Sequence, residues 1–139
     1  MHVADPRQMP ATVFMYTLHP TRLEMLTSGP TEAEVTAAAE HWAYSQRLLA
    51  DGTVVFAGRT MTRDPDTFAL VVIRAESADA ARAMMNDDPA VKGGVFRARL
   101  YPFQPMLMGD WPPEAATVPI AAQDPQSDAA DAEEAQLPG

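Results

Sequence analysis

The chain contains no cysteine. This absence excludes disulfide bonds, thiolate catalysis and cysteine-bound metals, and it is typical of a reducing compartment. Long hydrophobic runs are also missing, because the longest one, residues 68–73, is far too short to span a bilayer. Residues 1–7 lack the hydrophobic segment of a secretory signal. These absences predict a soluble, cytoplasmic protein that has no membrane partner.

Positive charge is scarce as well. The chain carries 10 Lys and Arg residues against 19 Asp and Glu residues, which gives a net charge of −9. Six of the acids and none of the bases lie beyond Trp111, so 13 acids and 10 bases remain in the rest of the chain. Neither part offers the basic patch that nucleic acid or an anionic membrane requires. We therefore expect no nucleic-acid partner.

Composition divides the chain into three parts. Residues 1–11 are polar and contain two prolines, which predicts a flexible lead-in. Residues 12–111 contain the amphipathic segments and the length of one domain. Residues 112–139 are rich in proline, alanine and acids, which predicts a tail that is mobile or loosely docked.

Four segments are rich in β-branched and aromatic residues and predict strands over residues 12–19, 53–58, 67–74 and 95–101. Residues 31–50 predict a helix that begins with a capping box formed by Thr31 and Glu34. Residues 78–86 predict a second helix capped by Ser77. The interval 20–30 is predicted to be a loop that packs on the domain edge or covers a pocket.

Helical spacing gives the first helix an apolar stripe that we expect to face the core. The members of this stripe are Val35, Ala38, Ala39, Trp42 and Leu49.

The predicted order of elements is strand, helix, strand, strand, helix, strand. This order is that of the ferredoxin-like βαββαβ arrangement, an α+β fold with a four-stranded antiparallel sheet and two helices on one face. Residues 68–73 are apolar at successive positions, as in a strand that is covered on both faces. A second copy of the chain would cover the open face most economically. We therefore expect a homodimer, a dimeric α+β barrel.

An acidic pair, Asp87 and Asp88, precedes Pro89 at the end of the second predicted helix, and a glycine turn at residues 93–94 follows. A carboxylate at a helix C-terminus is unfavourable because the macrodipole is negative there. Two interpretations follow: both acids are solvated turn residues, or one of them is held in place for a function.

His41 lies on a different side of the first predicted helix from Trp42, together with Tyr44, Ser45 and Leu48. This mixture of polar and apolar side chains is typical of a pocket wall. Tyr44 and Ser45 are therefore candidate substrate-binding residues, although a solvated hydroxyl is the alternative for Ser45.

Three arginines are candidates for anion recognition. Arg22 is the one cation in residues 20–30, where the alternative is a salt bridge at the rim of the domain. Arg97 and Arg99 alternate onto one face of the last predicted strand. On an open surface they would be solvated or salt-bridged, whereas inside a closed cavity they would bind an anion.

Five segments of the chain together resemble the YciI-like (YCII-related) family of the dimeric α+β barrel superfamily. They are residues 40–44, 49–54 with 57–58, 76–81, 88–95 and 101–103. The most specific parts are the His that precedes Leu-x-Asp-Gly and the run Asp-Pro-x-Val-x-x-Gly. The resemblance covers roughly residues 12–108. It implies a His and an Asp that face each other in a pocket beside the sheet, which correspond here to His41 and Asp88. It also implies that some members resemble dehydrochlorinases of chlorinated hydroxyquinols.

A carboxylate bonded to one imidazole nitrogen fixes the tautomer and raises the basicity of the other nitrogen. His41 and Asp88 would then act as a general-base dyad in a small-molecule enzyme of the lyase or hydrolase type, through elimination or hydrolysis. The alternative is a non-catalytic small-molecule-binding module, because fold does not determine function. No metal-ligand spacing such as H-x-x-x-H is present. We therefore expect neither a metal nor a cofactor, with a His41–Asp88 metal site and haem chemistry as the weaker alternatives.

Overall fold

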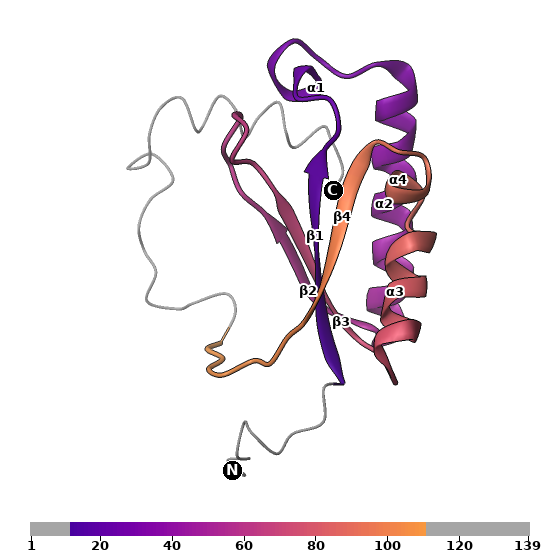
Figure 1. Ribbon diagram of the computed structural model, residues 1–139, viewed down its shortest axis with the longest axis vertical. Helices are drawn as coiled ribbons and strands as arrows, with labels where there is room; N and C mark the ends of the chain where they lie inside the picture. Colours follow the sequence, from indigo (N-terminus) through magenta and orange to yellow (C-terminus); the bar gives the residue numbers. More distant parts are fainter. Residues whose placement is uncertain (1–11, 111–139) are drawn as a thin grey trace.

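The computed structural model describes residues 12–110. The predicted lead-in over residues 1–11 and the predicted tail over residues 112–139 lie outside this range. Figure 1 shows a twisted sheet with the long helices on one side of it. None of the helices in the described range is long and apolar enough to cross a membrane.

The sheet has four strands in the order β2-β3-β1-β4, and all neighbouring strands are antiparallel. Their bounds are β1 Val13–Pro20, β2 Val54–Arg59, β3 Ala69–Arg74 and β4 Phe96–Pro102. β1 and β3 are central, and β2 and β4 form the edges. The predicted α+β, ferredoxin-like architecture is confirmed.

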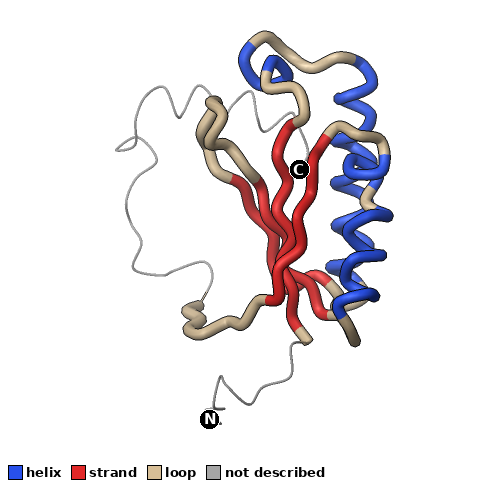
Figure 2. Tube along the Cα trace, in the orientation of Figure 1, coloured by secondary structure: helices blue, strands red, loops and turns tan. Residues whose placement is uncertain are grey.

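The two long helices are α2, Glu32–Ala50, and α3, Ala78–Asp87, close to their predicted bounds. The capping box of Thr31 and Glu34 is present at the start of α2. Figure 2 shows both helices on the same face of the sheet, and no helix of residues 12–110 lies on the other face.

Two short helices interrupt segments that were predicted to be a loop and a turn. α1, Glu24–Thr27, forms because one helical turn buries the side chains of Met25 and Leu26. α4, Pro89–Lys92, forms because Pro89 is well suited to the first position of a helix. An N–H group at that position has no acceptor within the helix, so proline loses no hydrogen bond there.

The core lies between the sheet and the helices. Alternate residues of β1 face this side, and they pack with alternate residues of β3 and with the inner side of α3. The buried cluster consists of Phe14, Tyr16, Leu18, Val54, Val71, Ile73, Ala75, Ala81 and Met85. Val72 is also buried although it points to the opposite face, so β3 is buried on both faces, as predicted.

The predicted core face of α2 is wrong. Val35, Trp42 and Leu49 are 43%, 48% and 57% exposed, and of the predicted stripe only Ala38 is buried. The residues that α2 buries are Glu34, Ala37, Ala38, His41 and Ser45. α2 packs against α4 and β2, and its small alanines allow the close approach that brings its polar side chains inward.

Candidate active site

Asp88 occupies the junction between two helices. It is the C-cap of α3 and the N-cap of α4, with the extended ψ of 122° that a following proline favours. Its Oδ1 accepts a hydrogen bond from the Ala90 N–H at 3.1 Å. The carboxylate therefore lies at the favourable end of α4, which corrects the expectation that it lies unfavourably at a helix C-terminus.

The other carboxylate oxygen, Oδ2 of Asp88, accepts two further hydrogen bonds. Nδ1 of His41 lies 2.7 Å away and the Tyr16 hydroxyl lies 2.9 Å away. Asp88 is 0% exposed and His41 is 3% exposed. The structure thus brings together His41 from α2 and Asp88, which are 47 residues apart in the chain. Asp87 is exposed, so the two acids of the pair differ completely in environment.

The hydrogen bond to Asp88 sets the state of the His41 ring. Because Oδ2 is the acceptor, the hydrogen of a neutral imidazole lies on Nδ1 and the lone pair lies on Nε2. Within residues 12–110, Nε2 has no hydrogen-bond partner. The Phe96 ring meets the imidazole edge-on, with ring centroids 6.1 Å apart. Of the two ring nitrogens, Nε2 is therefore the one that can accept a proton.

Tyr16 completes the site, and the sequence reasoning did not assign it a role. Burial and then the negative charge of Asp88 raise the pKa of Tyr16, so its hydroxyl keeps its proton and donates. A signal was available: Tyr16 lies between Phe14 and Leu18 on the inward-facing side of β1, and a buried tyrosine hydroxyl needs a partner.

Tyr44 ties α2 to α3. Its hydroxyl donates a 2.7 Å hydrogen bond to the carbonyl oxygen of Met84. Burial raises the pKa of Tyr44 to about 12, with a further contribution from the charges of Asp87 and Asp88. The hydroxyl therefore stays protonated at neutral pH, and its predicted contact with substrate stays a prediction.

Ser45 lies four residues after His41, on the same side of α2, and it is buried. A solvated hydroxyl, the alternative interpretation, does not describe it. Its Oγ has no hydrogen-bond partner in the part of the chain that the structure describes. A buried hydroxyl without a partner is destabilising. Its predicted contact with substrate is untested, and the missing bond is one that a ligand could supply.

Arg22 is paired with Glu34 instead of joining the His41–Asp88 pair. Its Nε and Nη2 donate to the two carboxylate oxygens of Glu34 at 2.9 and 2.6 Å, and Nη2 also donates to the carbonyl of Gly29. This geometry is the salt bridge that was the alternative for Arg22. An anionic ligand at Arg22 would have to compete with the Glu34 carboxylate.

A family model described as the YCII-related domain matches residues 12–104. The chain belongs to the YCII-related family. The resemblance carried by the five sequence segments is confirmed. A comparison of the chain with curated proteins found no match.

Among solved structures, the YCII-related protein is similar to TftG, the 5-chloro-2-hydroxyhydroquinone dehydrochlorinase from Burkholderia phenoliruptrix AC1100, in complex with 2,5-dihydroxybenzoquinone. The sequences are 20% identical and the TM-score is 0.48. The match covers 66% of this chain and 93% of that chain.

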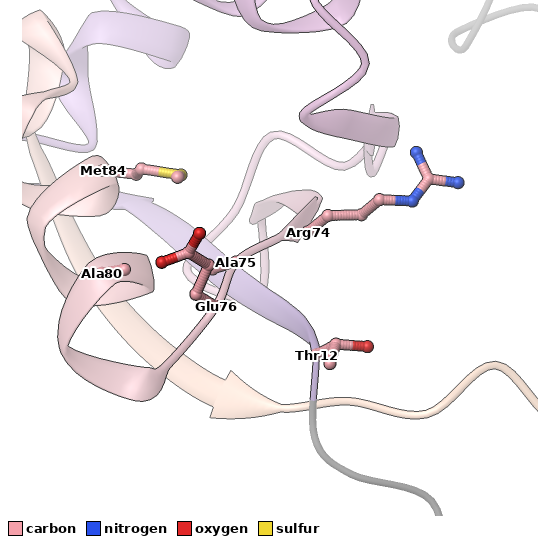
Figure 3. A pocket seen from close by; sticks show the side chains of 6 residues that line it. All are labelled: Thr12, Arg74, Ala75, Glu76, Ala80 and Met84. Atoms are coloured by element: carbon pink, nitrogen blue, oxygen red, sulfur yellow. The ribbon is translucent and has the colours of Figure 1, made fainter.

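A pocket of about 480 Å³ lies between the start of β1, the end of β3 and α3 (Figure 3). Its lining residues are Thr12, Arg74, Ala75, Glu76, Ala80 and Met84. The Arg74 side chain extends away from Glu76 and donates to the carbonyl of Gly52 at 2.8 Å. None of the predicted site residues lines this pocket, so it is distinct from the His41–Asp88 site. Among residues 12–110, no three His, Cys, Asp or Glu side chains are grouped to hold a metal ion.

The Arg22–Glu34 pair predicts an acid-dependent contribution to the stability of the YCII-related protein. The hydrogen bonds from Arg22 lower the pKa of Glu34 below its ordinary value. This contribution is therefore present above the ordinary glutamate pKa and is lost as the pH falls through the lowered value. Glu34→Gln keeps a capping-box residue but removes the charge. Since the Arg22 side chain is 37% exposed, we expect the free energy of unfolding to fall by about 0.5 kcal/mol near neutral pH.

Urea unfolding of the wild type and Glu34→Gln at a series of pH values measures this difference. The difference should shrink toward zero in acid, as the wild-type carboxylate becomes protonated. A difference that is constant with pH would show that Glu34 acts through packing instead of charge.

Proposed function

We propose that this protein is a small-molecule enzyme in which His41 acts as a general base and Asp88 positions it. One observation carries the proposal: a fully buried carboxylate holds Nδ1 of His41 at 2.7 Å and leaves Nε2 without a partner within the described residues. This arrangement suits a histidine base, because the carboxylate fixes the tautomer and stabilises the imidazolium that forms when the ring accepts a proton.

The reaction that we propose is an elimination. In the keto tautomer of a chlorinated hydroxyhydroquinone, the chlorine is carried by an sp3 carbon. Nε2 of His41 takes a proton from a substrate hydroxyl group, a carbonyl double bond forms, and the displaced electron pair shifts through the ring and breaks the C–Cl bond, so that chloride leaves. The substrate then loses the elements of HCl with no oxidant or reductant, and His41 passes its proton to water. The sequence resemblance to a family with dehydrochlorinases makes chlorinated hydroxyhydroquinones the first substrates to test. Hydrolysis by an activated water is the second reaction that the same base would support.

Three further residues are proposed to contact the substrate. Ser45 has an unpartnered hydroxyl on the same side of α2 as His41, and a substrate oxygen would supply the missing hydrogen bond. The half-buried Tyr44 would offer its ring to an aromatic substrate. Arg22 would bind an anionic group of the substrate only if that group displaced the Glu34 carboxylate from the guanidinium.

The test is an assay of chloride release by the full-length protein, with substrate loss followed in parallel. We expect one chloride per molecule of chlorinated hydroxyhydroquinone consumed, at a rate well above that in buffer. Saturable binding of these compounds without any chloride release or other consumption would contradict the enzymatic proposal and favour a binding module.

We also propose that the protein is a homodimer that associates through the open face of the sheet. No helix of residues 12–110 lies on this face, and Phe56 of β2, which is paired with Val72 of β3, is 52% exposed there. A large apolar side chain exposed on such a face favours association with a second copy of the chain.

Sedimentation velocity tests the dimer. Two chains of 15.1 kDa should sediment together, and Phe56→Glu should give a folded monomer. Trp42→Glu is the matched control, because Trp42 is exposed on α2, on the opposite side of the sheet. A dimer that is lost in Trp42→Glu and kept in Phe56→Glu would place the interface on the helices.

A further inference from the structure

The sheet is positively charged although the protein as a whole is acidic. The four strands contain no Asp or Glu, in a chain whose net charge is −9. They contain four arginines, which are Arg59, Arg74, Arg97 and Arg99. The negative charges of the described residues therefore lie outside the strands.

Two of these arginines lie in register with polar residues of β1. Arg97 is opposite His19 and Arg99 is opposite Thr17 in the antiparallel β1–β4 pair. Directly opposite residues have Cβ atoms about 5 Å apart. Tyr16 points to the helices, so the alternation of the strand turns Thr17 and His19 toward the open face, together with their arginine partners.

Both arginines are exposed, and no carboxylate of residues 12–110 pairs with their guanidinium groups. Among residues 12–110, neither Arg97 nor Arg99 forms an ion pair. The Arg99 guanidinium lies 5.1 Å from the centroid of the Tyr101 ring, a contact that orients its planar group. The positive charge on this edge of the sheet is therefore not neutralised by the described residues.

Thr17 supplies an independent observation. The residue is 8% exposed, and its Oγ1 is buried with no hydrogen-bond partner within residues 12–110. An orphaned hydroxyl beside Arg99, on a strand that could have carried valine, lacks a bond that a ligand oxygen would make. His19 stacks on Phe68, with ring centroids 6.1 Å apart, and this contact holds the imidazole on the same face.

We propose that Arg97, Arg99, His19 and Thr17 form a second binding site, on the open face of the sheet, for a small oxyanion carried as a phosphate or carboxylate group. Arginine donors match the geometry of both groups, and the hydroxyl and imidazole add further hydrogen bonds. The two sites lie on opposite faces of the sheet. Tyr16 donates to Asp88 on the helix face, and the next residue, Thr17, points to the open face.

Isothermal titration calorimetry of the full-length protein tests the site, with inorganic phosphate and succinate as separate ligands at constant ionic strength. We expect saturable binding of at least one of them. Arg99→Gln should weaken that binding about tenfold or more, because a charge-assisted hydrogen bond is lost. Arg82→Gln is the matched control, since Arg82 is an exposed arginine of α3, and it should bind as the wild type does.

Two more variants test the role of the Thr17 hydroxyl and the independence of the two sites. Thr17→Val should weaken anion binding and raise the melting temperature, because it removes the orphaned hydroxyl at nearly constant volume. His41→Gln should bind the anion normally, which keeps the result independent of the proposed reaction. Saturable binding of phosphate alone would identify a phosphate site, binding of succinate alone would identify a carboxylate site, and binding of both would identify a site for either group. No saturable binding, or equal binding by Arg99→Gln and Arg82→Gln, would overturn the proposal.

Discussion

Replacing Asp88 with alanine should lower the free energy of unfolding by about 3–5 kcal/mol. The carboxylate is 0% exposed and accepts from the Tyr16 hydroxyl, from Nδ1 of His41 and from the Ala90 N–H. Alanine leaves these three donors buried without an acceptor, and it also removes the N-cap of α4. Urea unfolding followed by far-UV circular dichroism measures the loss.

Two further variants, Asp88→Asn and Asp87→Ala, test whether the loss of stability comes from the hydrogen bonds of Asp88. Asparagine keeps the shape and one carbonyl oxygen, which can still serve Tyr16 and His41. Its amide nitrogen would then face the Ala90 N–H, donor against donor, so we expect an intermediate loss of about 1–3 kcal/mol. The exposed neighbour Asp87→Ala should change stability by less than about 0.5 kcal/mol. Equal losses for the alanine variants at 87 and 88 would show that the hydrogen-bond network does not hold the fold.

Replacing His41 with glutamine should reduce the turnover of a chlorinated hydroxyhydroquinone by about 10²–10⁴-fold, as expected when a general base is removed. A glutamine amide can still donate to Oδ2 of Asp88, so the buried carboxylate keeps a partner, but no basic nitrogen remains where Nε2 was. The effect should therefore fall on kcat and kcat/KM far more than on stability. Initial rates of chloride release measure it.

Glu40→Gln is the control for this experiment. Glu40 precedes His41 on α2 and is exposed, so its variant should turn over substrate at the wild-type rate. Undiminished turnover by the folded His41→Gln protein would show that a different group removes the proton. Equal losses in both variants would indicate a general disturbance of α2.

The fold could be predicted because its signals are local. Four β-rich segments, two capped helices and their order were enough to obtain the antiparallel sheet with both long helices on one face. The short helix α1 was missed, since it depends on the burial of Met25 and Leu26 by other parts of the chain. α4 was missed because Pro89 was considered only as the end of one helix and not as the first residue of the next.

The orientation of α2 shows where such reasoning fails. Val35, Trp42 and Leu49 repeat every seven residues and dominate any count of apolar side chains, yet all three are exposed. The side that packs is instead lined by small residues and by His41, whose burial is offset by its hydrogen bond to Asp88. That contact is formed between residues far apart in the chain, so no local pattern reports it. It was expected from the resemblance to the YCII-related family.

One carboxylate connects the architecture of the protein to its proposed reaction. Oδ1 of Asp88 fixes the first turn of α4, and Oδ2 fixes the imidazole of His41. A substitution of Asp88 that changes the basicity of His41 would therefore also lower the melting temperature. Variants with higher turnover and unchanged thermal stability should therefore be sought among residues that contact the substrate, where the two properties can be selected separately.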